Sequence, residues 1–268
     1  MFVCLLHAYY YVGVVSFQLS TNVGFIPNVT ITLETAMKGT QTFLLICMVF
    51  VASTFAAVSQ SSHVMTKEQQ DALTPDAVLQ EFQEGNRRFT QETITRRDHS
   101  AMVRKTAGGQ YPKAVILSCL DSRIPIEDVV DQGLGDVFVA RIAGNVINDD
   151  ILGSMEFGCA VMGSKLILVV GHTNCGAVKG AIDDVEIDHI GILLAKIRPV
   201  VKQTPSTTSD RTSKNAAFVE SVSQAHVDHV VTEIRRRSKI LATLEAEGKI
   251  KIVGSYYDLE TGVLTMRK

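Results

Sequence analysis

Three short, mostly apolar runs constrain the fold of this chain more than any other feature of its sequence. They lie at residues 114–117, 137–142 and 165–170. Their hydrophobicity is continuous rather than alternating, which is typical of strands that are buried on both faces of a sheet. Helical patterns at residues 125–132 and 150–162 separate the runs, and Gly133 and Gly163 close these patterns. Alternating strands and helices predict an α/β fold whose parallel strands are joined by right-handed crossovers.

Further elements are predicted on either side of this core. Thr74 and Pro75 are a typical helix cap and first-turn residue, and they predict an N-terminal helical arm that runs to about Phe89. Gly85 is a weak point within that helix. Helices at residues 188–202, 216–237 and 240–247 follow, and then a strand pair at residues 249–257 and 263–266. The sequence thus predicts a central, mostly parallel β-sheet flanked by helices, with a C-terminal edge hairpin.

The first 58 residues differ in composition from the rest of the chain. Residues 1–36 contain no Lys or Arg, whereas Met37 opens a pattern typical of a secretory signal peptide. This pattern consists of Lys38, an apolar run at residues 43–51 and small residues at 52–59. We therefore expect residues 1–36 to be an overextended N-terminus, 37–58 a signal peptide and 59–268 a domain that is periplasmic or secreted.

No stable membrane anchor is expected. The apolar run at residues 43–51 is shorter than the roughly 20 residues that a membrane-spanning helix needs. The alternative is an anchor at residues 2–19, but His7 and Gln18 interrupt it and no basic residue flanks it. The net charge of −2 at pH 7 also provides no general basic surface for nucleic acid or anionic lipid, so a small-molecule substrate is favoured.

The residues that can carry chemistry follow the ends of the predicted strands. Cys119 comes directly after the first apolar run, and His172 and Cys175 come after the third. In open α/β sheets, functional groups gather beyond the carboxyl ends of the strands. Two cysteines and one histidine with an open fourth position form a recognised catalytic zinc site. The odd number of cysteines after residue 58 also argues against a disulfide framework, and we predict one bound Zn²⁺ per subunit.

The sequence around these three residues resembles the two signature blocks of the β-class carbonic anhydrases, in their bacterial, plant-like form. The blocks are Ser118-Cys119-Leu120-Asp121-Ser122-Arg123 and Gly171-His172-Thr173-Asn174-Cys175-Gly176. Residues 138–145 are similar to the central segment of the family, and the resemblance covers roughly residues 74–268. It implies that the cysteines and the histidine bind the metal, and that Asp121 and Arg123 form a catalytic dyad. In such a dyad the guanidinium group fixes the carboxylate bidentately and keeps it ionised.

The resemblance implies a zinc-dependent, reversible hydration of carbon dioxide to bicarbonate and a proton. In this chemistry a zinc-bound hydroxide attacks the carbon atom. In some members the Asp at the position of Asp121 instead binds the metal and gives a closed, inactive state. Those members also have an inhibitory bicarbonate site made of a Trp, an Arg and a Tyr. Arg141 and Tyr257 match the last two, but Ile116 replaces the Trp, so we expect the open form.

The resemblance also implies a substrate pocket, formed by Gln110, Phe138, Phe157 and Gly176. The family has a Tyr where this chain has Phe157, so the pocket wall is apolar at that point and its hydroxyl is absent. In the family the Gln often reaches across a dimer interface. We therefore expect a homodimer or a homotetramer.

Several alternatives remain open. The same fold can hydrolyse carbonyl sulfide or carbon disulfide, and a zinc-binding domain without turnover could keep the same ligands. Asp121 could also be the fourth ligand of a closed structural zinc site. His189, His226 and His229 lie on predicted helices, where any of them could transfer protons, and the sequence assigns them no role.

The signal peptide leads to a direct prediction. If export begins at Met37, N-terminal sequencing of the exported protein should find a first residue between 57 and 60, because cleavage requires small residues. Recovery of exported protein that retains residues 1–36 would contradict this interpretation.

Overall fold

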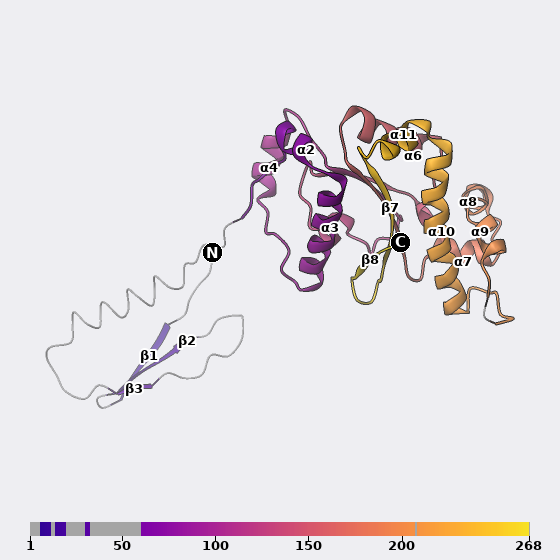
Figure 1. Cartoon of the computed structure of the whole chain (residues 1–268). Helices are drawn as coiled ribbons and strands as arrows, with labels where there is room; N and C mark the ends of the chain where they lie inside the picture. The colour runs from indigo at the N-terminus through magenta and orange to yellow at the C-terminus, as the bar shows by residue number, and fades with distance from the viewer. Residues whose placement is uncertain (1–5, 12–13, 20–29, 33–59, 207, 268) are drawn as a thin grey trace. The chain divides into compact units, whose positions relative to one another are not determined.

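The computed structural model describes residues 6–11, 14–19, 30–32, 60–206 and 208–267 (Figure 1). The chain forms two compact units, Met1–Val58 and Ser59–Lys268. In the first unit, strands β1 (Leu6–Tyr11), β2 (Val14–Leu19) and β3 (Thr30–Thr32) pair antiparallel in that order. The predicted signal peptide lies outside the described residues. Of the helices that the structure describes, none is both long enough and apolar enough to span a bilayer.

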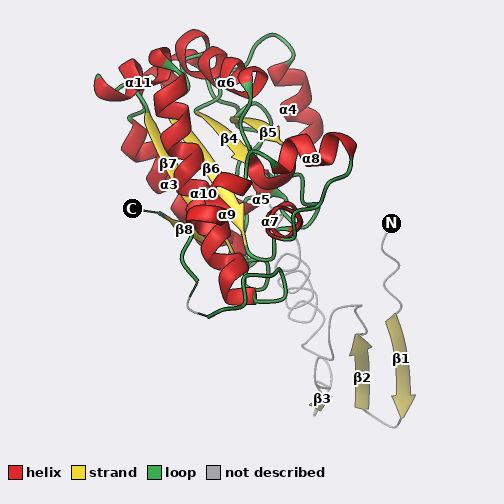
Figure 2. Ribbon diagram, turned by 90° about the vertical axis from the view of Figure 1, so that its right-hand side faces the viewer, coloured by secondary structure: helices red, strands yellow, loops and turns green. Residues whose placement is uncertain are grey.

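The second unit is built on a sheet of five strands (Figure 2). The strands are β4 (Ala114–Ser118), β5 (Val137–Arg141), β6 (Leu166–His172), β7 (Lys251–Tyr257) and β8 (Leu264–Met266), in the spatial order β5-β4-β6-β7-β8. The first four run parallel, and β8 pairs antiparallel with β7 at one edge. The predicted α/β class, the mostly parallel sheet and the edge hairpin are confirmed.

Helices cover both faces of the sheet, which explains why its inner strands are continuously apolar. On one face, Ile116 of β4 joins a core with α3 (Pro75–Thr90), α5 (Ile126–Val129) and α7 (Gly176–Ile182). On the other, Val115 and Leu117 join a core with α6 (Asp149–Glu156), α10 (Ala216–Arg237) and α11 (Lys239–Ala246). Burial of an aliphatic side chain of this size stabilises the fold by about 2 kcal/mol, so both faces of β4 select apolar residues.

Most predicted helix ends agree with the structure. Thr74 caps α3 by accepting a hydrogen bond from the Ala77 amide at 3.2 Å, and Pro75 occupies the first turn. The prediction for α10 matches both of its ends, and Asn215 caps it. Two short helices, α2 (Lys67–Ala72) and α4 (His99–Thr106), were not predicted.

Three predicted helices differ in the structure. The helix expected at residues 125–132 ends at Val129, because Asp131 adopts a φ of 50° and buries its carboxylate against Arg88 and Arg97. The helix expected at 150–162 becomes π-helical from Phe157 to Val161.

The helix expected at residues 188–202 is two helices, α8 (Asp188–Leu194) and α9 (Arg198–Gln203). Pro199 explains the break, since a proline inside a helix has no amide donor and clashes with the carbonyl four residues earlier. It is instead accommodated in the first turn of α9.

Gly85 is a point of close contact rather than a weak point of the arm. A Cβ atom added at this position would overlap the backbone carbonyl of Val130, which follows α5. The absence of a side chain therefore lets α3 approach the body of the protein.

We predict that Gly85→Ala lowers the free energy of unfolding by about 2 kcal/mol, because overpacking against a backbone atom forces the helix away. Gly153→Ala in α6 is the matched control, since its Cβ would meet no atom within 4 Å. It should raise stability by about 0.5–1 kcal/mol through helix propensity. Urea denaturation of both variants measures the difference, and equal stabilities would contradict the packing argument.

Candidate metal centre

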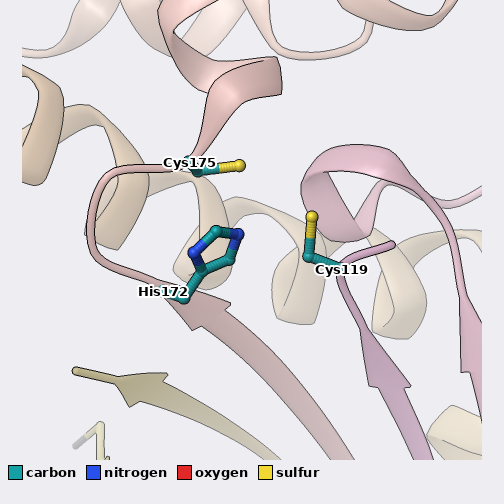
Figure 3. A group of neighbouring side chains, drawn as sticks. All are labelled: Cys119, His172 and Cys175. Carbon is teal, nitrogen blue, oxygen red and sulfur yellow. The ribbon is translucent and has the colours of Figure 1, made fainter. Parts of the chain in front are cut away.

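Cys119, His172 and Cys175 converge at the carboxyl edge of the sheet (Figure 3). Cys119 follows β4, His172 is the last residue of β6, and Cys175 caps α7. Strands β4 and β6 pair in parallel with Ser118 opposite Val170, so their ends lie side by side. One Sγ or ring nitrogen from each residue lies within 4.8 Å of the other two, and all three side chains are buried. The structure thus brings together the three residues that the sequence proposed as ligands.

The histidine of this cluster is oriented by the backbone that follows it. His172 Nδ1 lies 2.8 Å from the carbonyl oxygen of Thr173, and a carbonyl can only accept, so Nδ1 carries the proton. The lone pair of Nε2 then faces the two cysteines. Nε2 is buried and has no hydrogen-bond partner among the described residues. An oriented histidine with a free, buried nitrogen is what a metal site requires.

The two thiols are electrostatically coupled. A hydrogen bond from the Cys175 thiol, helped by the backbone amides of Asp121 and Gly144, lowers the pKa of Cys119 well below its usual range despite its burial. The same contact, together with burial, raises the pKa of Cys175. Near neutral pH the metal-free pair therefore carries one thiolate and one proton. A divalent cation such as Zn²⁺ can replace that proton, so the donor set fits this metal.

Asp121 and Arg123 form a bidentate pair beside the cluster. Arg123 Nε donates to Asp121 Oδ1 at 2.9 Å and Nη2 to Oδ2 at 2.6 Å, and the Arg123 amide adds a third bond at 3.0 Å. The guanidinium group lowers the pKa of the Asp121 carboxyl well below its usual range. Asp121 Oδ2 lies 4.0 Å from His172 Nε2. An ionised carboxylate of fixed orientation is thus held at the edge of the cluster.

Arg141 has a contact that the sequence analysis did not anticipate. Its guanidinium donates to the carbonyl oxygens of Cys119 and Asp121, at 3.1 Å in the first case. It therefore clamps the loop that carries one cysteine and the dyad carboxylate. Its place in the sequence, at the end of the predicted strand next to β4, could have indicated this contact, because Arg141 lies opposite Ser118.

The predicted pocket residues do not gather around the cluster within one chain. Phe138 pairs with Val115 near the start of β4, which places it about 13 Å along the strand from Cys119. The ring of Phe157, half exposed, lies 6.5 Å from that of Phe138. Gln110 precedes β4 and is exposed. Of the four residues, only Gly176 is next to a cluster residue, as the first residue of α7.

Comparison with known proteins identifies the family. A family model described as carbonic anhydrase matches residues 114–264, which is more than half of the chain. Carbonic anhydrase 2 of Mycobacterium tuberculosis is 36% identical over 197 residues, covering 72% of this chain and 93% of the relative. The chain belongs to the β-carbonic anhydrase family. The resemblance drawn from the signature blocks is confirmed.

Other relatives support the same assignment to the carbonic anhydrases. The carbonic anhydrase of Mycolicibacterium smegmatis is 34% identical over 195 residues, covering 72% of this chain and 93% of its own length. The crystal structure of the β-carbonic anhydrase CafA of Aspergillus fumigatus has a TM-score of 0.57 at 25% identity, covering 72% and 90% of the two chains. That of Coccomyxa β-carbonic anhydrase, solved in complex with acetazolamide, has a TM-score of 0.56 at 25% identity, covering 68% and 83%.

We predict that zinc binding to this carbonic anhydrase releases one proton. Between pH 7.5 and 9 the logarithm of the association constant should rise by about one per pH unit, because the thiol of Cys175 must ionise. Competition with a chelator of known affinity measures the slope. Cys159→Ala should leave it unchanged, since that buried thiol, whose pKa burial raises to about 12, lies outside the cluster. A slope of zero or two protons per zinc ion would contradict the conclusion that the two cysteines share one proton.

Proposed function

We propose that this carbonic anhydrase catalyses the zinc-dependent, reversible hydration of carbon dioxide to bicarbonate and a proton. The observation that carries the proposal is a buried Cys-His-Cys cluster beside a carboxylate clamped by an arginine. Cys119, His172 and Cys175 would hold the ion. When bound, Zn²⁺ supplies Lewis-acid activation of water near neutral pH.

Asp121 is the group that would handle the proton of the reacting water. Its carboxylate is ionised at neutral pH, so Oδ2 can accept a hydrogen bond and orient the water for attack. Arg123 contacts both carboxylate oxygens and favours the open form, in which Asp121 stays off the metal. The backbone clamp of Arg141 keeps this loop in place.

The substrate pocket would be completed by a second copy of the chain. Strand β5 is an edge of the sheet, its apolar residues are only partly buried, and the exposed ring of Phe157 lies beside it. Pairing of two such edges would cover these residues, and it could bring Gln110, Phe138 and Phe157 of one subunit toward the cluster of the next. The solved β-carbonic anhydrases of Sordaria macrospora are described as tetrameric. We therefore infer a homodimer or a homotetramer, and export directed by the segment that begins at Met37.

Asp121→Ala should separate metal binding from turnover. The cluster stays intact, so the variant should bind one zinc per subunit, whereas loss of the proton acceptor should reduce kcat for hydration by about 10²–10⁴-fold. Stopped-flow hydration of carbon dioxide combined with elemental analysis measures both quantities.

Asp188→Ala is the matched control, because this carboxylate is exposed on α8. Its turnover should stay within twofold of that of the unmodified enzyme. Unchanged turnover in Asp121→Ala would remove Asp121 from the mechanism. A pure, unmodified protein that contains no stoichiometric transition metal would overturn the proposed function itself.

A further inference from the structure

Gly144 contacts both sides of the metal centre. Its amide donates to Cys119 Sγ, with an N to S distance of 3.3 Å. A Cβ atom added to Gly144 would lie 3.1 Å from the Cβ of Ala177, in the first turn of α7 behind Cys175, and 2.8 Å from Ile197 Cδ1. The residue is therefore packed against the helix that carries one cysteine while it donates to the other.

The turn at Gly144 and Asn145 has a backbone conformation that needs support from other parts of the protein. Gly144 and Asn145 have φ values of 66° and 42°, so two consecutive residues are left-handed, one of them not glycine. Such conformations cost energy and persist only where surrounding contacts fix them. Within the turn, the Asn145 amide donates to Ile142 at 2.9 Å. No backbone amide in the described part of the chain donates to the Gly144 carbonyl, so the partner of this oxygen must be a side chain.

That partner is His226, in the middle of α10. The side chain is 1% exposed, and its Nε2 lies 2.8 Å from the Gly144 carbonyl oxygen. Since the carbonyl only accepts, Nε2 carries the proton. Burial, with a smaller effect of the nearby His229, lowers the pKa of His226 to about 4, so the ring stays neutral and keeps one donor at working pH.

Packing alone does not explain a histidine at this position. The buried neighbours on the same helix include Val222, Val227 and Val230. The Nδ1 atom of His226 is buried and lacks a hydrogen-bond partner among the described residues, which is a cost that a valine or leucine would avoid. The bond to Gly144 is the contact that an apolar residue could not make.

We propose that His226 is a positioning residue for the metal centre: its bond to the Gly144 carbonyl holds the left-handed turn so that the Gly144 amide reaches the Cys119 sulfur. The inference rests on the proposed metal site but not on turnover. An amide bonded to a ligating thiolate withdraws charge from the sulfur, and such outer partners change metal affinity by about 10–100-fold. Without the bond from His226 the turn is no longer held, and the Gly144 amide no longer fixes the Cys119 sulfur beside the other two ligands.

The test uses the full-length protein loaded with Co²⁺, whose thiolate charge-transfer absorption reports on the sulfur ligands. His226→Leu should move this band to longer wavelength and weaken Zn²⁺ binding by about tenfold. His226→Gln places an amide donor near the position of Nε2 and should restore both values. His229→Gln is the matched control, because this half-buried ring packs near His226 without a hydrogen bond to the turn, and it should change neither value.

The outcomes separate this inference from the proposed function. A folded His226→Leu protein whose band is unshifted and whose Zn²⁺ affinity is within twofold of the unmodified protein would overturn the inference. A protein with the native sequence that shows no thiolate band with Co²⁺ would instead overturn the proposed metal centre.

If His226→Leu does not fold, ¹⁵N NMR of the unmodified protein tests the inference, because it shows which ring nitrogen of His226 carries the proton. The proton of His226 should be found on Nε2 across pH 6–9, and a proton on Nδ1 would contradict the bond to Gly144.

Discussion

The parallel pairing of β4 with β6 is the constraint on which the metal centre depends. Because Ser118 lies opposite Val170, the residues that follow the two strands emerge at the same edge of the sheet. The last residue of β6 is itself His172, and the short turn through Asn174, with a φ of 59°, directs Cys175 back toward Cys119. A shift of one residue in this register would move every side chain of β4 to the opposite face. Ile116 packs in one core, whereas Val115 and Leu117 pack in the other. Such a shift would exchange the side chains that fill each core, so this close packing fixes both the register and the site.

Charge balance is the second property that the site requires. Two buried cysteines would repel each other as thiolates, so the contact that lowers the pKa of Cys119 raises that of Cys175, and the metal-free pair retains one proton. A divalent cation would remove this repulsion, and His172 would bind it through Nε2. Positive charge from Arg123 and amide donors such as that of Gly144 stabilise the remaining anions. The centre is therefore arranged for a cation before one binds.

The surroundings of the cluster come from elements that are distant in the sequence. Arg141 reaches the Cys119 loop from β5, and His226 reaches the turn at Gly144 from α10. Each contact fixes a backbone carbonyl rather than a ligand side chain, so each acts on the geometry of the loops. Helix α10 packs along β6 and β7 and thus connects the main core to the loops at the site. In the role proposed for His226, this helix positions one ligand through a single hydrogen bond.

The sequence by itself determined the strands, most helices and the identity of the cluster residues. Continuous apolar runs specify doubly covered strands, and the signature blocks place Cys119, His172 and Cys175 at their ends. The C-terminal end of α5 and the break before α9 were not predicted. The buried ion pairs of Asp131 come from residues far apart in the chain, and Pro199 fits only in the first turn of a new helix. Only the tertiary structure decided that Gly85 is a contact point, that Phe138 lies away from the cluster of its own chain, and that His226 meets Gly144. Local patterns specify which face and which edge a residue occupies, whereas the partner of a buried polar atom depends on how separate elements pack.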